Sequence, residues 1–469
     1  MIFPTIVFAG FFALVLPASW LLMPYRTAWK LFMIAASYYF YAAGVDWHFT
    51  LLLAGCTFWN QAFAKLLGVA AMRRYSSWLV AIAVAGDLSM LGIFKYYGFF
   101  VTNVVAFTGR FGLPMPLPLA QLLLPTAISF FTFQAISYVV DVKRNKSASI
   151  STLDFAVYLA FFPHLLAGPI VRVSELVPQF LSARDPRKLE FSRAMGLICG
   201  GLIKKVLIAD FLSTQYVNNI FSSPQFHSRL DIVLGVYAYA VQIYCDFSGY
   251  TDIAIGIALL LGFQFPQNFN KPYAALSITE FWHRWHMTLS RWLRDYLYVP
   301  LGGNRHGRLQ TYRNLLLTML LGGLWHGAAW TFVIWGGLHG AGLAAERWWD
   351  ESKRKLSFNL PTAVRWFLIF NFICVAWVFF RADSLGNVGS MIGQLLGGTG
   401  ATTVTPTILL AMFAGMAVHF MPPQPGLALR RVYSRLSPVA QGLAFAAIVL
   451  FCGAVITGQG VAPFIYYRF

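Results

Sequence analysis

The sequence is poor in charged residues. Only 11% of its 469 residues are Asp, Glu, Lys or Arg, whereas 58% are hydrophobic, and the mean hydropathy is +0.62. Soluble domains carry about 25% charged residues. A soluble protein of this length would therefore lack the polar side chains needed to cover its core. The shortage excludes an ordinary soluble enzyme and indicates an integral membrane protein.

Cysteine and the common catalytic signatures are also scarce. The five cysteines lie in apolar segments without a C-x-x-C pair, which excludes a disulfide framework and a zinc site; they are Cys56, Cys199, Cys245, Cys374 and Cys452. No Walker A loop, H-E-x-x-H motif or G-x-S-x-G elbow occurs. We therefore expect no bound metal or cofactor, and neither a nucleotide hydrolase nor a serine hydrolase.

Long apolar runs are plentiful instead. A helix needs about 20 residues to cross the hydrocarbon core. We expect an all-α polytopic membrane protein with about ten to twelve spanning helices, forming one membrane domain over 1–469 with its catalytic core at 118–347. Two further segments, 152–181 and 271–312, are expected to be interfacial or re-entrant. The expected spans are 3–23, 31–46, 49–69, 78–100, 118–140, 152–170, 194–213, 230–262, 314–343, 363–380, 405–421 and 438–457.

Positive charge predominates in the loops. The formal net charge is +18, from 35 Lys and Arg against 17 Asp and Glu. Arg26 and Lys30 follow the first apolar run, and the positive-inside rule then places the N-terminus outside and Arg73 and Arg74 in the cytoplasm. Because these charges are dispersed and lack an aromatic–basic RNA motif, we expect contact with anionic lipids and no nucleic acid.

A polar and aromatic segment covers 277–304. Its apolar residues recur every three or four positions, which predicts one amphipathic helix with a stripe of Ile278, Phe281, Trp282, Trp285, Leu289, Trp292, Leu293 and Tyr296. Arg284, Arg291 and Arg294 lie on the other side. They either anchor the helix to lipid or bind the phosphates of coenzyme A at a cytoplasmic funnel. His286 lies beside the stripe, so we expect it to point into the protein.

Histidines also occur in the apolar segment 314–347. Ionisable groups at membrane depth are costly and tend to be functional. The glycines near His326 allow close helix packing or leave room for a substrate, and we favour a catalytic role for His326. Imidazole can take a hydroxyl proton near neutral pH. For His339 we favour a packing role. Asp246 either orients a histidine or an arginine, or pairs with a basic residue.

Two runs of the chain resemble a known family. SITEFWHRWHMTLSRWLRDYLYVPLGGNR at 277–305 and YRNLLLTMLLGGLWHGAAWTFVIWGGLHG at 312–340 are similar to the membrane-bound O-acyltransferase (MBOAT) family, in its bacterial alginate O-acetylation branch. FFPHLLAGPIVR, GLIKKVLIAD and YCDFSGYTDIAIGIALLLGF agree with it. The resemblance is ordered along nearly the whole chain and weakens beyond about residue 385.

The resemblance implies a mechanism and partners. The functional histidine of the family's W-H-G element corresponds to His326, next to Trp325, and a second polar position corresponds to His286. Helices around a central funnel would take acetyl-CoA as donor from the cytoplasm. Acetyl groups would leave the bacterial inner membrane for an exported, alginate-like polysaccharide through periplasmic SGNH-type acetyltransferases. His283 stands where a second arginine is expected, which puts a phosphate contact there in doubt.

Other functions compete with this one. A relative of the same family could acylate peptidoglycan, cellulose, teichoic acid, a protein or a lipid. A proton-coupled transporter using His326 as a relay is disfavoured because polar and glycine-rich sequence gathers once, at 245–342, and not in two symmetric halves.

Overall fold

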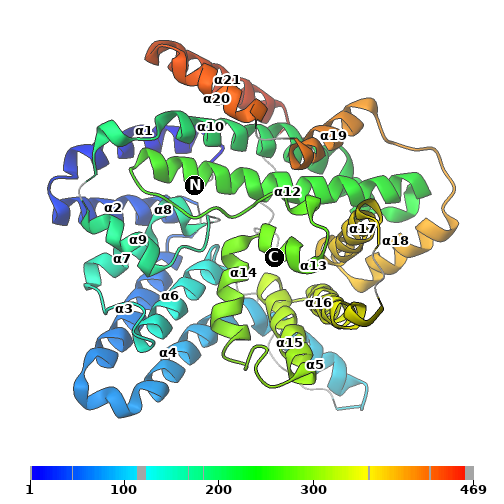
Figure 1. Cartoon of the computed structure of the whole chain (residues 1–469), viewed down its shortest axis with the longest axis horizontal. Coiled ribbons are helices and arrows are strands. Elements are labelled where there is room, and N and C mark those ends of the chain that lie inside the picture. The colour runs from blue at the N-terminus through cyan, green and yellow to red at the C-terminus, as the bar shows by residue number, and fades with distance from the viewer. Residues whose placement is uncertain are drawn as a thin grey trace. The chain divides into compact units, whose positions relative to one another are not determined.

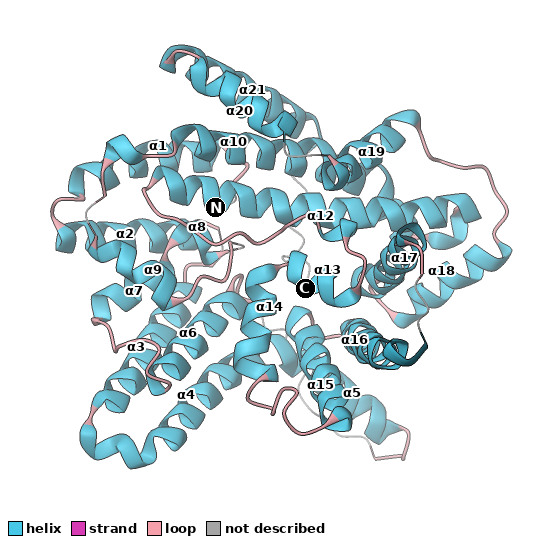
Figure 2. Ribbon diagram, in the orientation of Figure 1, coloured by secondary structure: helices cyan, strands magenta, loops and turns pink. Residues whose placement is uncertain are grey.

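The computed structural model describes residues 3–44, 46–113, 123–166, 168–182, 184–356, 360–421 and 424–459. Within these ranges every regular element is a helix and none is a strand (Figure 2). The all-α class predicted from the sequence is therefore confirmed for the part of the chain that is described. The first residues of the expected span 118–140 lie outside it, because positions 118–122 are not among these ranges.

The chain packs into two compact units. The first comprises Met1–Leu189 with Ile257–Phe265, and the second Glu190–Gly256 with Pro266–Phe469. The expectation of one membrane domain stays a prediction. The helices of the first unit are α1 (Ile6–Leu22), α2 (Arg26–Ala42), α3 (Phe49–Gly68), α4 (Ser76–Leu91), α5 (Tyr97–Gly109), α6 (Ile128–Lys143), α7 (Thr152–Ala160), α8 (Phe162–Leu165) and α9 (Val173–Leu181).

The second unit holds the polar segments singled out in the sequence. Its helices are α10 (Phe191–Leu202), α11 (Asn218–Ser222), most of α12 (Arg229–Leu260), α13 (Ile278–Arg284), α14 (Met287–Leu293), α15 (Arg308–His326), α16 (Trp330–Leu356), α17 (Thr362–Arg381), α18 (Leu385–Gly397), α19 (Pro406–Phe420), α20 (Gln424–Arg435) and α21 (Pro438–Gln459). Two π-helical stretches, η4 (Ile203–Asp210) and η8 (Arg294–Tyr298), continue α10 and α14.

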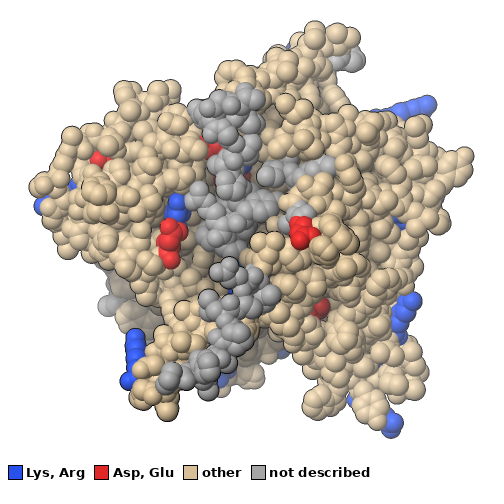
Figure 3. All heavy atoms as spheres, turned by 180° about the vertical axis from the view of Figure 1, so that it is seen from behind, with Lys and Arg blue, Asp and Glu red and all other residues tan. Residues whose placement is uncertain are grey.

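Some helices are long and apolar enough to cross a membrane. Among the described residues these are Ala70–Gly109, Arg229–Leu260 and Thr362–Arg381, and shorter apolar helices cover Ile6–Leu22, Pro406–Phe420 and Val439–Val455. Large apolar side chains such as Phe367 on α17, 57% exposed, face outward. Figure 3 shows a face in which Lys, Arg, Asp and Glu are few. Such a surface suits contact with lipid.

Within the first unit, α3, α4 and α6 pack against one another (Figure 1). Lys30 on α2 and Asp154 on α7 form a mostly buried ion pair with 2.5 Å between Nζ and Oδ1. Because either charge alone would be costly at this depth, the pair fixes α2 against α7.

The structure corrects the expected helix over 314–343. The chain instead breaks after His326 and forms α15 and α16, which pack side by side (Figure 1). A Cβ atom on Gly323 would lie 2.3 Å from the carbonyl oxygen of Phe332, and one on Gly336 would lie 2.2 Å from that of Met319. The glycines therefore let two backbones touch, as in small-residue helix pairs in membranes.

The expected amphipathic helix over 277–304 is also wrong. It divides into α13 and α14 at Trp285 and His286, and His286 has a left-handed backbone with φ of 41°. The apolar stripe still faces inward, since its members from Ile278 to Leu293 are buried. The hydrophobic period correctly predicts the buried face, but it does not reveal the break at His286, which the loop before α13 imposes.

Candidate active site

His326 is the last residue of α15. Gly327 follows with an extended backbone, φ −162° and ψ 150°, and ends the helix. A Cβ atom at Gly327 would lie 2.1 Å from the ring of Phe332, so the turn requires glycine. His326 is 4% exposed. The break thus places an imidazole at a helix end inside the second unit.

Aromatic rings surround this imidazole. The ring centroids of Trp325, Trp335 and Phe380 lie 4.9, 5.0 and 5.2 Å from that of His326, at steep interplanar angles of 75°, 85° and 70°. Trp325 and Trp335 are buried. Because buried aromatic rings limit the access of water, electrostatic interactions with a charge that develops at this imidazole are stronger than in solvent.

His339 lies one element further on, in α16. Its Nδ1 accepts a hydrogen bond from Nε1 of Trp282 at 3.3 Å, and its ring centroid lies 4.9 Å from that of Trp335. It is completely buried. These contacts suit the packing role favoured for His339, and they place it beside the aromatic surroundings of His326.

His286 occupies a different aromatic environment. Phe247 and Phe269 have ring centroids 4.7 and 6.4 Å from the imidazole, which is completely buried. Its Nδ1 lies 3.1 Å from Oδ1 of Asn268. Burial disfavours the charged imidazolium. The prediction that His286 points into the protein is therefore confirmed.

Backbone pairing holds the break at His286. The loop before α13 donates from Asn270 N to the carbonyl of Arg284 at 2.9 Å, and Met287 N donates to the carbonyl of Asn268 at 2.9 Å. A left-handed non-glycine residue is strained and persists only where its surroundings determine it. Such strain gathers at functional sites, which fits the role expected for His286.

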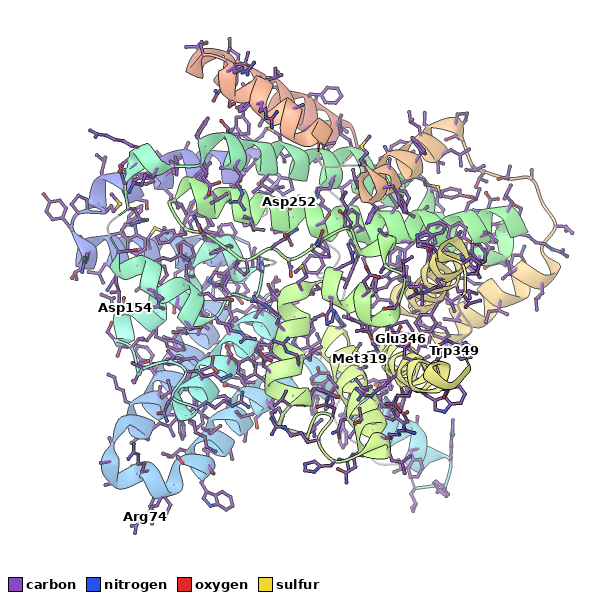
Figure 4. All side chains as sticks on the ribbon, viewed as in Figure 1. Arg74, Asp154, Asp252, Met319, Glu346 and Trp349 are labelled. Carbon is purple, nitrogen blue, oxygen red and sulfur yellow. The ribbon has the colours of Figure 1, made fainter. Side chains whose placement is uncertain are left out.

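A cavity of about 790 Å³ opens between α13–η8 and the α15–α16 pair. This volume lies within the range of small-molecule sites, about 300–1,000 Å³. Trp282 forms part of the wall, and Met319 and Glu346 contribute from α15 and α16 (Figure 4). The full lining is Thr279, Trp282, His283, Met287, Ser290, Arg291, Leu293, Arg294, Tyr298, Leu315, Thr318, Met319, Leu343, Glu346, Arg347, Asp350 and Glu351.

The charges of this cavity balance. Its basic residues are Arg291, Arg294 and Arg347 and its acidic ones are Glu346, Asp350 and Glu351, three against three. Several are already engaged. Arg347 contacts Glu351 at 3.3 Å, and Glu346 accepts the backbone N–H groups of Ile278 and Thr279 at the start of α13. Among the described lining residues there is therefore no excess of positive charge of the kind that the local sequence suggested.

The three arginines of the sequence prediction separate. Arg291 and Arg294 line the cavity, and Arg294 also pairs with Asp295, with Nε 2.8 Å from Oδ1. Arg284 is not among the lining residues and pairs with Glu280, with Nη2 2.7 Å from Oε1. Burial raises the pKa of Glu280, but hydrogen bonds from Leu276 N–H and from Arg284 outweigh burial and hold the pKa below its ordinary value. Arg284 thus takes part in a local ion pair.

Asp246 lies in a buried charge cluster. Lys205 Nζ is 2.5 Å from Oδ1 of Asp246 and 2.7 Å from Oδ1 of Asp210, and the lysine side chain is 1% exposed. Next to it, Lys204 pairs with Asp252, which Figure 4 labels on α12. Of the two roles left open for Asp246, the geometry favours pairing with a basic residue.

The sequence patterns did not predict two residues that contact the candidate site residues His286 and Asp246. Asn268 lies in the loop QNFN, where no periodicity marks it, and Lys205 lies in an apolar run whose only unusual feature is its two lysines. A buried lysine implies a carboxylate partner, so that signal was available. Among the described residues, no three His, Cys, Asp or Glu side chains gather as metal ligands would.

Comparison with known proteins gives consistent matches. A family model described as "MBOAT, membrane-bound O-acyltransferase family" matches residues 120–385. The chain is 41% identical to the probable alginate O-acetylase AlgI of Pseudomonas putida, over 94% of each chain. It is 45% identical to the protein of the same name in Pseudomonas aeruginosa, over 76% of this chain and 67% of that one. A peptidoglycan O-acetyltransferase of Helicobacter pylori is 38% identical, over 84% of this chain and 78% of that one.

Proposed function

The chain belongs to the membrane-bound O-acyltransferase family, and from this premise we propose that it takes acetyl groups from acetyl-CoA for the O-acetylation of an exported, alginate-like polysaccharide. Membership makes it a membrane enzyme that transfers an acyl group to an oxygen. The acetyl donor, the polymer and the direction across the bilayer are our proposals.

The observation that carries the proposal is His326, buried in its aromatic surroundings at the break between α15 and α16. Acetyl transfer forms a C–O bond to the acceptor hydroxyl and breaks the C–S bond of the thioester. The hydroxyl proton passes to a base and then to the leaving thiolate. A buried neutral imidazole suits this role, either as the base or as a transient carrier of the acetyl group.

The donor is proposed to occupy the 790 Å³ cavity. Trp282, Met287, Leu293, Leu315, Met319 and Leu343 give it an apolar wall, which suits the long, weakly polar arm of coenzyme A. Arg291 and Arg294 would meet its phosphates, since guanidinium forks bind phosphate oxygens well. Trp282 also contacts His339 and Trp335, so the donor's thioester would lie toward the rings around His326.

The membrane arrangement extends this proposal. About ten to twelve spans around a funnel would carry acetyl groups through the bacterial inner membrane. Periplasmic SGNH-type acetyltransferases would then place them on the polymer. The apolar runs of the sequence and the apolar helices Arg229–Leu260 and Thr362–Arg381 support several crossings.

Peptidoglycan is the one alternative acceptor that a specific observation supports. The relatives named for alginate are 41–45% identical to this chain, and the relative named for peptidoglycan is 38% identical. Both polymers carry sugar hydroxyls. Deleting the gene and measuring ester-linked acetate in purified exopolysaccharide and in purified peptidoglycan decides between them: our proposal requires the loss in the exopolysaccharide.

The catalytic test uses His326→Ala and His326→Gln in that deletion strain, with His306→Ala as control because His306 lies in an exposed loop. We expect both His326 variants to reach the membrane at normal levels and to leave the polymer without acetate, while the control restores it. Normal acetate with His326→Ala would overturn the assignment.

A further inference from the structure

Asn268 accepts three hydrogen bonds on a single oxygen. Its Oδ1 lies 3.1 Å from Nδ1 of His286, 3.2 Å from the backbone N of Thr288 and 2.9 Å from Oγ1 of Thr288. All three residues are buried, with exposures of 0%, 0% and 2%. The oxygen of one loop residue therefore holds the side chain of His286 and the first turn of α14 together.

These contacts determine the orientation of the amide. A backbone N–H can only donate, so the atom of Asn268 that faces Thr288 N must be the carbonyl oxygen and not the amide nitrogen. The same oxygen faces His286. Because a carbonyl oxygen only accepts, Nδ1 of His286 must carry its proton there.

The protonation of the second ring nitrogen, Nε2, follows from that of Nδ1. In a neutral imidazole with a proton on Nδ1, Nε2 bears a lone pair and accepts hydrogen bonds. Nε2 of His286 is buried, and it has no hydrogen-bond partner among the described residues; the same holds for Nδ2 of Asn268. Buried polar atoms of native proteins are nearly always paired, which points to a ligand group at this place.

We propose that Asn268 is a positioning residue that fixes His286 as a hydrogen-bond acceptor at Nε2, so that His286 binds the hydroxyl group of the acetyl acceptor. This inference rests on the proposed function for the identity of that group. An accepting nitrogen suits an O–H group, whereas the thioester carbonyl needs a donor. His286 therefore holds the acceptor, and the carbonyl is bound elsewhere.

The first test reads the tautomer directly. The full-length protein is labelled with ¹⁵N-histidine, placed in lipid nanodiscs and compared by NMR with His286→Gln, which removes the His286 signals. We expect a protonated Nδ1 and a non-protonated Nε2 for His286. A protonated Nε2 would overturn the inference, whether or not the protein transfers acetate, so this failure is separable from failure of the proposed function.

The second test separates positioning from general stability. Membranes receive acetyl-labelled acetyl-CoA and alginate oligomers as the final acceptor, together with the periplasmic acetyltransferases that the proposed function requires. Asn268→Leu, similar in size, should lower turnover at least about tenfold, the loss seen when the partner that orients a metal-bound histidine is removed, with the KM for acetyl-CoA unchanged. Asn268→Asp keeps an accepting oxygen and should restore part of the turnover.

A matched control is Asn371→Leu. Asn371 also accepts a hydrogen bond from a side chain, 2.7 Å from the Tyr237 hydroxyl, but lies on α17 away from the cavity lining. We expect wild-type turnover from it. Normal turnover with Asn268→Leu, or equal losses with Asn268→Leu and Asn268→Asp at normal protein levels, would overturn the positioning role. Should Asn268→Leu fail to accumulate, the Asp variant and the tautomer measurement still decide.

Discussion

The indole of Trp282 donates a hydrogen bond to Nδ1 of His339, with 3.3 Å between the nitrogens, while the same indole lines the 790 Å³ cavity. One side chain therefore connects the space proposed for the donor with the rings around His326. The contact also fixes the tautomer of His339, since an indole N–H can only donate.

This contact gives a test of the packing role of His339. His339→Phe keeps a ring against Trp335 but leaves the buried indole N–H of Trp282 unpaired. We expect the free energy of unfolding to fall by about 1–3 kcal/mol, with acetyl transfer per folded molecule little changed. Thermal unfolding in detergent and turnover normalised to folded protein measure both. Lost turnover at unchanged stability would instead make His339 a catalytic participant.

His286 and His326 are expected to act in one reaction. Residues that serve one transition state are not additive when removed. His286→Ala should reduce acetyl transfer, and His286→Ala combined with His326→Ala should be no slower than His326→Ala alone. Turnover in membranes, corrected for protein level, gives the comparison. Losses that multiply would mean that the two histidines contribute independently.

The arginines allow a matched comparison on one segment. Arg291 lines the cavity, whereas Arg284 is not among the lining residues and pairs with Glu280. Arg291→Glu should raise the apparent KM for acetyl-CoA, since a phosphate contact becomes a repulsion, and high salt should weaken donor binding to the wild type. Arg284→Glu should leave the KM unchanged. Equal acetyl-CoA affinity in both variants and the wild type would retire Arg291 as a donor contact.

The sequence predicted what depends on local pattern. Helical class, the inward face of Ile278 and Phe281 and the burial of His286 and His326 all follow from apolar periodicity and from the rarity of ionisable residues in such segments. It did not predict the break at His286, because that turn is held by Asn268, eighteen positions upstream. Contacts of this kind require the fold.

The sequence did not distinguish among the arginines for the same reason: the deciding contacts come from other elements of the fold. Arg291 and Arg284 look equivalent on one helical face, yet only Arg291 reaches the cavity. The cavity also has acidic lining residues, among them Glu346 and Asp350, and these lie on α16, a different element. The pairing of Arg284 with Glu280 could have been read from their i, i+4 spacing. Charge counted along one segment cannot reveal the charge that another element brings opposite it.

Membrane orientation can be tested at the two ends of α3. Trp47 precedes this helix and Arg73 follows it, and Figure 4 labels the neighbouring Arg74. Twenty helical residues extend about 30 Å, enough to separate the two positions across a bilayer. Single cysteines at 47 and 73 in a cysteine-free background should react with an impermeant thiol reagent outside at 47 only. Reaction at 73 alone would reverse the orientation predicted from the basic loops.

The buried cluster around Lys205 predicts which substitutions lower the free energy of unfolding most. One lysine lies between two carboxylates, so removing it leaves both Asp210 and Asp246 without their partner cation, whereas Asp246→Asn leaves Lys205 paired with Asp210. Breaking a buried ion pair costs about 3–5 kcal/mol. We expect Lys205→Met to lower the free energy of unfolding by at least this amount, and Asp246→Asn by much less.

Lys204→Met serves as the neighbouring control. Its pair with Asp252 is more accessible, with side-chain exposures of 17% and 27%, so water can solvate the carboxylate that remains and the loss should be smaller than for Lys205→Met. Membrane yield and thermal unfolding of the three variants give the order. The competing role for Asp246, orientation of a catalytic group, makes a different prediction: Asp246→Asn would then abolish acetyl transfer in protein as stable as the wild type. That result would move Asp246 from the supporting structure into the reaction.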